Sequence, residues 1–244
     1  MAINNAAERR AFERRFFLTI AILFPIVALI GFAPTYYLKP LFDTPPVPRL
    51  VIHLHALLMA AWIVFFIAQV YFIRSTRIKT HQQLGVVSIV LAVAIFVTGL
   101  VTAVAATKYG SSSTPPGVDP LQFLIVPFFD MLVFAVLFAG AVYYRRNAPN
   151  HKRLMLLTVL NFLPPALARY PFGLTAAFGP LWFFGVVDLV AIIFVAVDTW
   201  RNGKLNKVFL AGTIFLVASH WLRLAISSTP AWVNFAAWMT SIGG

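Results

Sequence analysis

Six side chains that could bind a ligand or carry a proton lie within long apolar runs of the sequence. They are two aspartates, two arginines and two histidines: Asp130, Asp188, Arg169, Arg223, His55 and His220. An ionisable group at the centre of a membrane costs about 2.5–3.5 kcal/mol on insertion scales, so such groups are candidates for function. Carboxylates and imidazoles are donors that zinc accepts, and guanidinium groups bind anions. These residue types predict a site for a metal ion or a small ligand.

Counting along the sequence places these side chains at similar depths. Asp130, for example, lies 15 residues before the basic turn at Arg145. With a rise of about 1.5 Å per residue, most of the six lie roughly 20–24 Å from the inner surface, and His55 lies at roughly 28 Å. We therefore expect one pocket in the outer half of the membrane. The expected metal ligands are His55, His220 and Asp130, and the expected ligand-binding residues are Arg169, Arg223 and Asp188.

The same residues are consistent with several functions. A membrane-embedded hydrolase would use a metal-held water and an arginine that stabilises the oxyanion. A b-type haem held by His55 and His220 would make the protein an electron carrier. Two aspartates and two arginines could also neutralise one another, as in a non-catalytic subunit or assembly factor of a larger membrane complex. Enzymatic activity is therefore left open, with zinc and haem b as the two cofactors that the donors suggest.

The other three histidines have simpler expected roles. His53 is two residues from His55, so on a helix the two point to nearly opposite sides, and we expect His53 to form hydrogen bonds at the interface. His81 and His151 follow basic turns in two similar predicted hairpins. A haem between them would be exposed among the headgroups, so contact with lipid phosphate is the expected role of this pair.

The composition requires lipid around most of the chain. Apolar residues make up 61% of the 244 residues and charged residues 11%, whereas a soluble domain has about 25% charged residues. The sequence has no Cys, which excludes a disulfide framework and a thiolate metal site.

An apolar helix of about 20 residues crosses a bilayer core of about 30 Å, and the sequence has seven such runs. They are 16–34, 51–73, 83–106, 121–144, 153–169, 180–199 and 207–226. The fifth run contains Pro164 and Pro165, which predict a kink. A short helix at 230–242, capped by Thr229, is expected at the outer interface because it carries two tryptophans. We therefore predict an all-α fold in which residues 1–244 form one domain with seven transmembrane helices.

The basic residues predict the orientation. Fourteen of the 19 Lys and Arg residues lie before the first run or after the second, fourth and sixth runs. Because Lys and Arg concentrate on the cytoplasmic side, we expect the N-terminus inside and the C-terminus outside. Topology and anionic headgroups explain the net charge of +12, so no nucleic acid partner is expected. The expected partners are the lipid bilayer and other membrane proteins, in a bacterial inner membrane.

Four motifs resemble a family of bacterial seven-span inner-membrane proteins whose activity is uncharacterised. They are GFAPTYYL at 31–38, HLHA at 53–56, HQQLG at 81–85 and HKRLMLL at 151–157. This resemblance implies the seven-helix topology and no activity. Seven-span hydrolases related to ceramidases and adiponectin receptors, which hold zinc with three histidines and an aspartate, are similar in architecture only. Their paired histidines on the last helix are absent here, because Leu216 and Leu224 lie four residues either side of His220.

Overall fold

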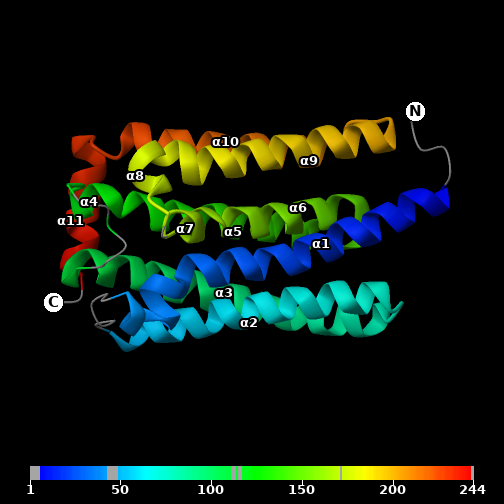
Figure 1. The fold of residues 1–244 in the computed structure, drawn as a ribbon, viewed down its shortest axis with the longest axis horizontal. Coiled ribbons are helices and arrows are strands. Elements are labelled where there is room, and N and C mark those ends of the chain that lie inside the picture. Colours follow the sequence, from blue (N-terminus) through cyan, green and yellow to red (C-terminus); the bar gives the residue numbers. More distant parts are fainter. Residues whose placement is uncertain (1–5, 43–48, 111–113, 115–116, 171, 243–244) are drawn as a thin grey trace.

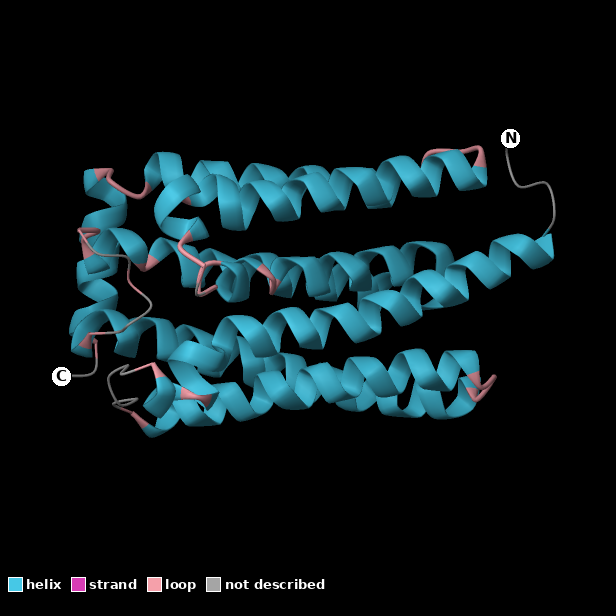
Figure 2. Ribbon diagram, viewed as in Figure 1, coloured by secondary structure: helices cyan, strands magenta, loops and turns pink. Residues whose placement is uncertain are grey.

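The protein is an all-α, multi-pass membrane protein. The computed structural model describes residues 6–42, 49–110, 114, 117–170 and 172–242, and every regular element in these ranges is helical (Figure 2). Six helical segments are long and apolar enough to cross a membrane: Ala11–Tyr37, Leu50–Arg74, Ile78–Tyr109, Pro120–Arg146, Leu181–Asn202 and Lys207–Ile226. They match six of the seven predicted runs.

The main helices lie side by side along one axis (Figure 1). They are α1 (Ala6–Phe32), α2 (Leu50–Arg74), α3 (Ile78–Tyr109), α5 (Ile125–Tyr143), α6 (Ala148–Asn161), α9 (Val186–Asn202) and α10 (Lys207–Ile226). The pairs α2–α3, α5–α6 and α9–α10 are antiparallel hairpins. Helix α3 packs on α5, and both α5 and α6 pack on α10.

Shorter elements join or extend these helices. They are η1 (Ala33–Tyr37), η2 (Lys39–Leu41), α4 (Pro120–Phe123), η3 (Tyr144–Arg146), α7 (Pro164–Leu167), α8 (Leu174–Phe178), η4 (Leu181–Gly185) and α11 (Pro230–Ser241). The π-helical turns η1 and η4 extend α1 and begin α9. Such turns rotate the side chains that follow them and are frequent at functional sites.

The predicted fifth crossing at 153–169 is not one continuous helix. Helix α6 ends at Asn161, and α7 begins at Pro164, which confirms that the two prolines interrupt this run. Helix α6 packs on α5, α10 and α9, and α7 packs on α1. Every residue from Leu156 to Phe162 is buried. A broken backbone is tolerated at this depth because protein surrounds it.

The predicted interfacial helix at 230–242 is present as α11. It crosses the end of the bundle at a steep angle to the other helices (Figure 1). The Thr229 hydroxyl caps it by accepting a hydrogen bond from the Trp232 amide at 3.4 Å. The Trp232 indole donates to the Leu121 carbonyl in α4 at 2.9 Å, whereas Trp238 is exposed. Helix α11 is therefore fixed to the bundle along one face.

Candidate functional site

A buried ion pair joins α5 to α10. The Asp130 carboxylate accepts a hydrogen bond from Arg223 Nη1, and the two residues are 3% and 0% exposed. Arg223 also donates from Nε to the Ser219 carbonyl at 3.0 Å, from Nη2 to the Ser219 hydroxyl at 3.2 Å and from Nη1 to the Val126 carbonyl at 3.1 Å. Each guanidinium nitrogen thus has an acceptor, which offsets the cost of burying the charge.

A second buried pair joins α9 to α10. His220 Nδ1 lies 2.7 Å from Asp188 Oδ1, and the Trp221 indole donates to Asp188 Oδ2 at 2.8 Å. Both carboxylate oxygens are therefore engaged, and the His220 ring is held with its Nδ1 proton on the carboxylate. A histidine oriented in this way keeps Nε2 for other partners.

Phe184 in η4 connects the two pairs. Its ring stacks on the His220 ring with a centroid distance of 4.4 Å and an interplanar angle of 16°. The Arg223 guanidinium carbon lies 5.2 Å from the centroid of the same ring. Phe184 is completely buried. The structure thus brings Asp130, Arg223, Asp188 and His220 together in one cluster around Phe184, which we call the His220 cluster.

Arg169, which follows α7, lies at the border of the His220 cluster. The Asp130 carboxylate acts electrostatically on its guanidinium group. Arg169 also donates to the Pro165 carbonyl at 2.5 Å and lies over the Phe32 ring at 4.8 Å. The sequence left open whether Asp130 pairs with Arg169 or Arg223, and the direct hydrogen bond goes to Arg223. The two aspartates and two arginines of this region balance in charge.

Two buried polar atoms in this region have no hydrogen-bond partner in the described part of the protein. One is His220 Nε2, and the other is Asn161 Oδ1. Asn161 lies at the end of α6 and donates from Nδ2 to the Asp130 carbonyl at 2.9 Å. An unsatisfied buried acceptor costs about 1–3 kcal/mol. His220 Nε2 is therefore a buried polar atom without a described partner, close to an ion pair.

His55 makes its contacts outside the His220 cluster. Its Nδ1 lies 3.1 Å from the Thr98 hydroxyl on α3, and its ring is close to Gly99 where α3 crosses α5. No contact described for His55 involves His220 or either aspartate. Among the described residues, no three His, Cys, Asp or Glu side chains gather where they could hold a metal ion. Metal ligation by His55, His220 and Asp130 together thus receives no support.

The other histidines lie near the two ends of the bundle. The exposed His53 hydrogen-bonds through Nδ1 to the Tyr36 hydroxyl at 2.9 Å, and its interfacial role stays a prediction. The His81 and His151 rings lie side by side, with centroids 6.3 Å apart, and His151 Nδ1 donates to the Ala141 carbonyl at 2.8 Å. The pair therefore joins the starts of α3 and α6, the equivalent helices of the two similar hairpins.

Sequence reasoning missed a further ion pair, in which the arginine is buried. Arg153 was counted among the basic residues of an inner turn, but it is only 6% exposed. Its guanidinium group donates to both Asp198 oxygens, at 2.9 and 2.6 Å. Phe184 and Trp221 were also missed, because nothing in the sequence distinguishes them from the other aromatic residues.

Comparison of the chain with models of protein families, with curated protein sequences and with solved structures finds no match. The resemblance to a bacterial seven-span family stays a prediction that rests on four sequence motifs.

Proposed function

We propose that the protein binds a small ligand in the His220 cluster, through His220 Nε2. One observation carries this proposal: Nε2 is completely buried and meets no described partner, while Asp188 holds Nδ1 of the same ring. Histidines that bind metals or accept protons are commonly held in this way, with one ring nitrogen on a carboxylate and the other facing the ligand.

The surroundings of Nε2 favour one class of ligand. With the tautomer that donates Nδ1–H to Asp188, Nε2 would offer a lone pair, and the matching ligand group is an O–H or N–H donor or a metal centre. A metal ion is the weaker candidate, because Asp130 is held by Arg223 and no described cluster offers three ligands. The His55 contact with Thr98 likewise gives no second axial ligand for haem. We therefore infer a compact, uncharged molecule that donates a hydrogen bond to His220.

Substitution of His220 tests this proposal. We expect purified wild-type protein to carry a small organic molecule detectable by native mass spectrometry, and His220→Gln to lose it. The exposed His53→Gln variant is the matched control and should retain the molecule. A Soret band in visible absorption would instead identify haem, and stoichiometric zinc in elemental analysis would identify a metal site. If the wild-type protein carries none of these species, the cluster is structural, as in a non-catalytic subunit or assembly factor.

We also propose that the chain crosses a bacterial inner membrane seven times, with the N-terminus inside. Two observations support this topology. Helices α6 and α7 together run beside the long helices, and the N-terminal end of α1 lies at the same end of the bundle as the basic turns after α2, α5 and α9 (Figure 1). Broken helices occur in membrane proteins where other helices cover them.

Fusions to alkaline phosphatase, which is active only outside the cytoplasm, test the number of crossings. With seven crossings, a fusion at the C-terminus should be active and one inserted at Lys204, between α9 and α10, should be inactive. With six crossings and the N-terminus inside, a C-terminal fusion would be inactive. That outcome would contradict the proposed topology.

A further inference from the structure

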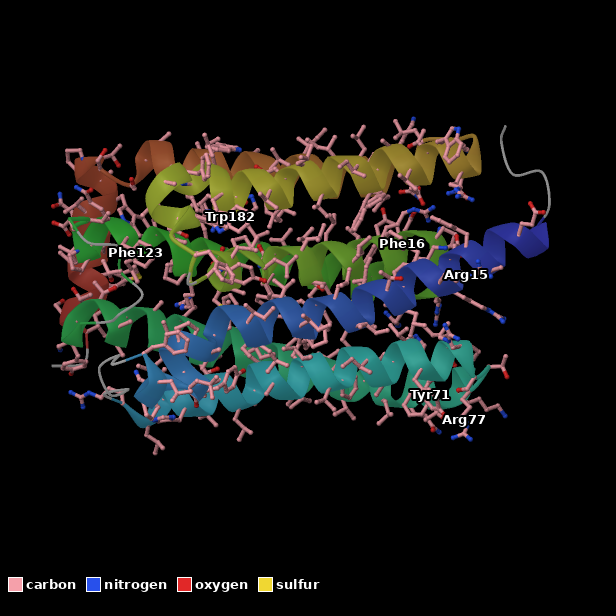
Figure 3. The ribbon with its side chains drawn as sticks, viewed as in Figure 1. Arg15, Phe16, Tyr71, Arg77, Phe123 and Trp182 are labelled. Atoms are coloured by element: carbon pink, nitrogen blue, oxygen red, sulfur yellow. The ribbon has the colours of Figure 1, made fainter. Side chains whose placement is uncertain are left out.

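A second candidate site lies at the other end of the bundle from α11. It is a cavity of about 40 Å³ between α1, α6 and α9, with apolar walls that include Phe12, Phe16, Leu156 and Val197. Phe16, near the N-terminal end of α1 in Figure 3, makes an edge contact with Phe194 of α9 at a centroid distance of 4.9 Å. A cavity of this size holds roughly three water molecules, and hence a small polar group.

Charged side chains line one side of this cavity, and most of them are paired. Lys152 Nζ lies 2.6 Å from Glu13 Oε1, and Arg153 binds Asp198 with a shortest distance of 2.6 Å. Arg201 also lines the cavity. Glu13 and Asp198 are neutralised by Lys152 and Arg153. Arg201 therefore gives the cavity an excess of one positive charge.

Arg201 is held in place without an acceptor for its Nε. Its guanidinium carbon lies 3.9 Å from the centroid of the Phe12 ring and 5.1 Å from that of Trp200. Nε is buried and has no hydrogen-bond partner among the described residues. A guanidinium group stacked on aromatic rings keeps its edge donors available for an oxyanion.

We propose that this cavity binds the phosphate of an anionic phospholipid, with Arg201 as the main donor. Arginine matches phosphate geometry with two parallel hydrogen bonds, and basic pockets between membrane helices bind anionic headgroups. Positions 201, 197, 193 and 189 follow one another at four-residue spacing on α9, so they form one ridge. Along it, Val197 lines the cavity, and Ile193 and Leu189 are exposed. The ridge therefore offers the acyl chains an apolar path directly below the headgroup.

Native mass spectrometry in detergent with added phosphatidylglycerol or phosphatidylcholine tests this site. We expect the wild-type protein to retain one phosphatidylglycerol molecule in preference to phosphatidylcholine. Arg201→Gln should weaken phosphatidylglycerol binding roughly tenfold, the loss of a charge-assisted hydrogen bond. Arg77→Gln is the matched control, because Arg77 is exposed on the α2–α3 turn (Figure 3) and does not line the cavity. It should leave this binding unchanged.

A conservative variant separates the charge of Arg201 from the geometry of its guanidinium group. Arg201→Lys retains the charge but not the fork of donors, so it should weaken phosphatidylglycerol binding less than Arg201→Gln does. If Arg201→Gln does not fold, the loss of binding in Arg201→Lys tests the proposal in its place. Equal binding of the two lipids, or equal losses in Arg201→Gln and Arg77→Gln, would overturn the proposal. Displacement of the lipid by excess inorganic phosphate would show a site for a soluble anion instead. His220→Gln should retain the lipid, because this site is separate from the His220 cluster.

Discussion

Replacing Arg223 by methionine should destabilise the folded protein by about 3–5 kcal/mol, the usual effect of removing one partner of a buried ion pair. Arg223 is completely buried, and Asp130 is 3% exposed. The variant would leave the Asp130 carboxylate inside the bundle without its cation. It would also remove the hydrogen bonds that Arg223 donates to the Ser219 and Val126 carbonyls. Unfolding by SDS in mixed micelles, compared with the wild-type protein, measures the change in the free energy of unfolding.

A double variant separates the ion pair from the packing of the side chains. Asp130→Leu combined with Arg223→Met removes both charges, so it should recover much of the stability that Arg223→Met loses. Arg145→Met is the control, because Arg145 is exposed near the α5–α6 turn, and it should change stability by no more than about 0.5 kcal/mol. A double variant as unstable as Arg223→Met alone would show that the buried charge is not the source of the loss.

Apolar length was a reliable guide to the long helices but not to the chain between α5 and α9. Runs of about 20 apolar residues fix where a helix can cross the bilayer, and six of the seven predicted runs are long helices. The fifth run differs because α6 is surrounded by protein, so lipid no longer constrains its length or polarity. This burial also explains Arg153, which pairs with Asp198 inside the bundle instead of facing water.

The sequence predicted the depth of the charged residues but not their partners. Counting from the basic turns gave similar depths to Asp130, Asp188, His220 and Arg223, and these four side chains meet around Phe184. Which residues pair depends on the rotation of each helix about its axis, and depth contains no information on rotation. His55, which was predicted to lie somewhat higher but in the same pocket, contacts Thr98 on α3 instead.

Contact between α1 and α7 should depend on a glycine. A Cβ added at Gly31 would lie 2.7 Å from the carbonyl carbon and 2.8 Å from the Cα of Ala166. Both are backbone atoms, so no side chain can rotate away. Ala166 is completely buried, and α7 is confined by the two prolines at its start. Small residues at membrane helix interfaces permit this close approach.

We therefore expect Gly31→Ala to lower the free energy of unfolding by about 3 kcal/mol, the upper part of the range for overpacked sites. Gly85→Ala in α3 is the matched control, because a Cβ there meets no atom within 4 Å. It should be neutral or stabilise the protein by up to about 1 kcal/mol.

The displacement of α7 would also move Arg169, which donates to the Pro165 carbonyl in α7. Gly31→Ala should thus weaken ligand retention at the His220 cluster while Gly85→Ala does not. Equal stabilities of the two variants in SDS unfolding would contradict the close α1–α7 contact.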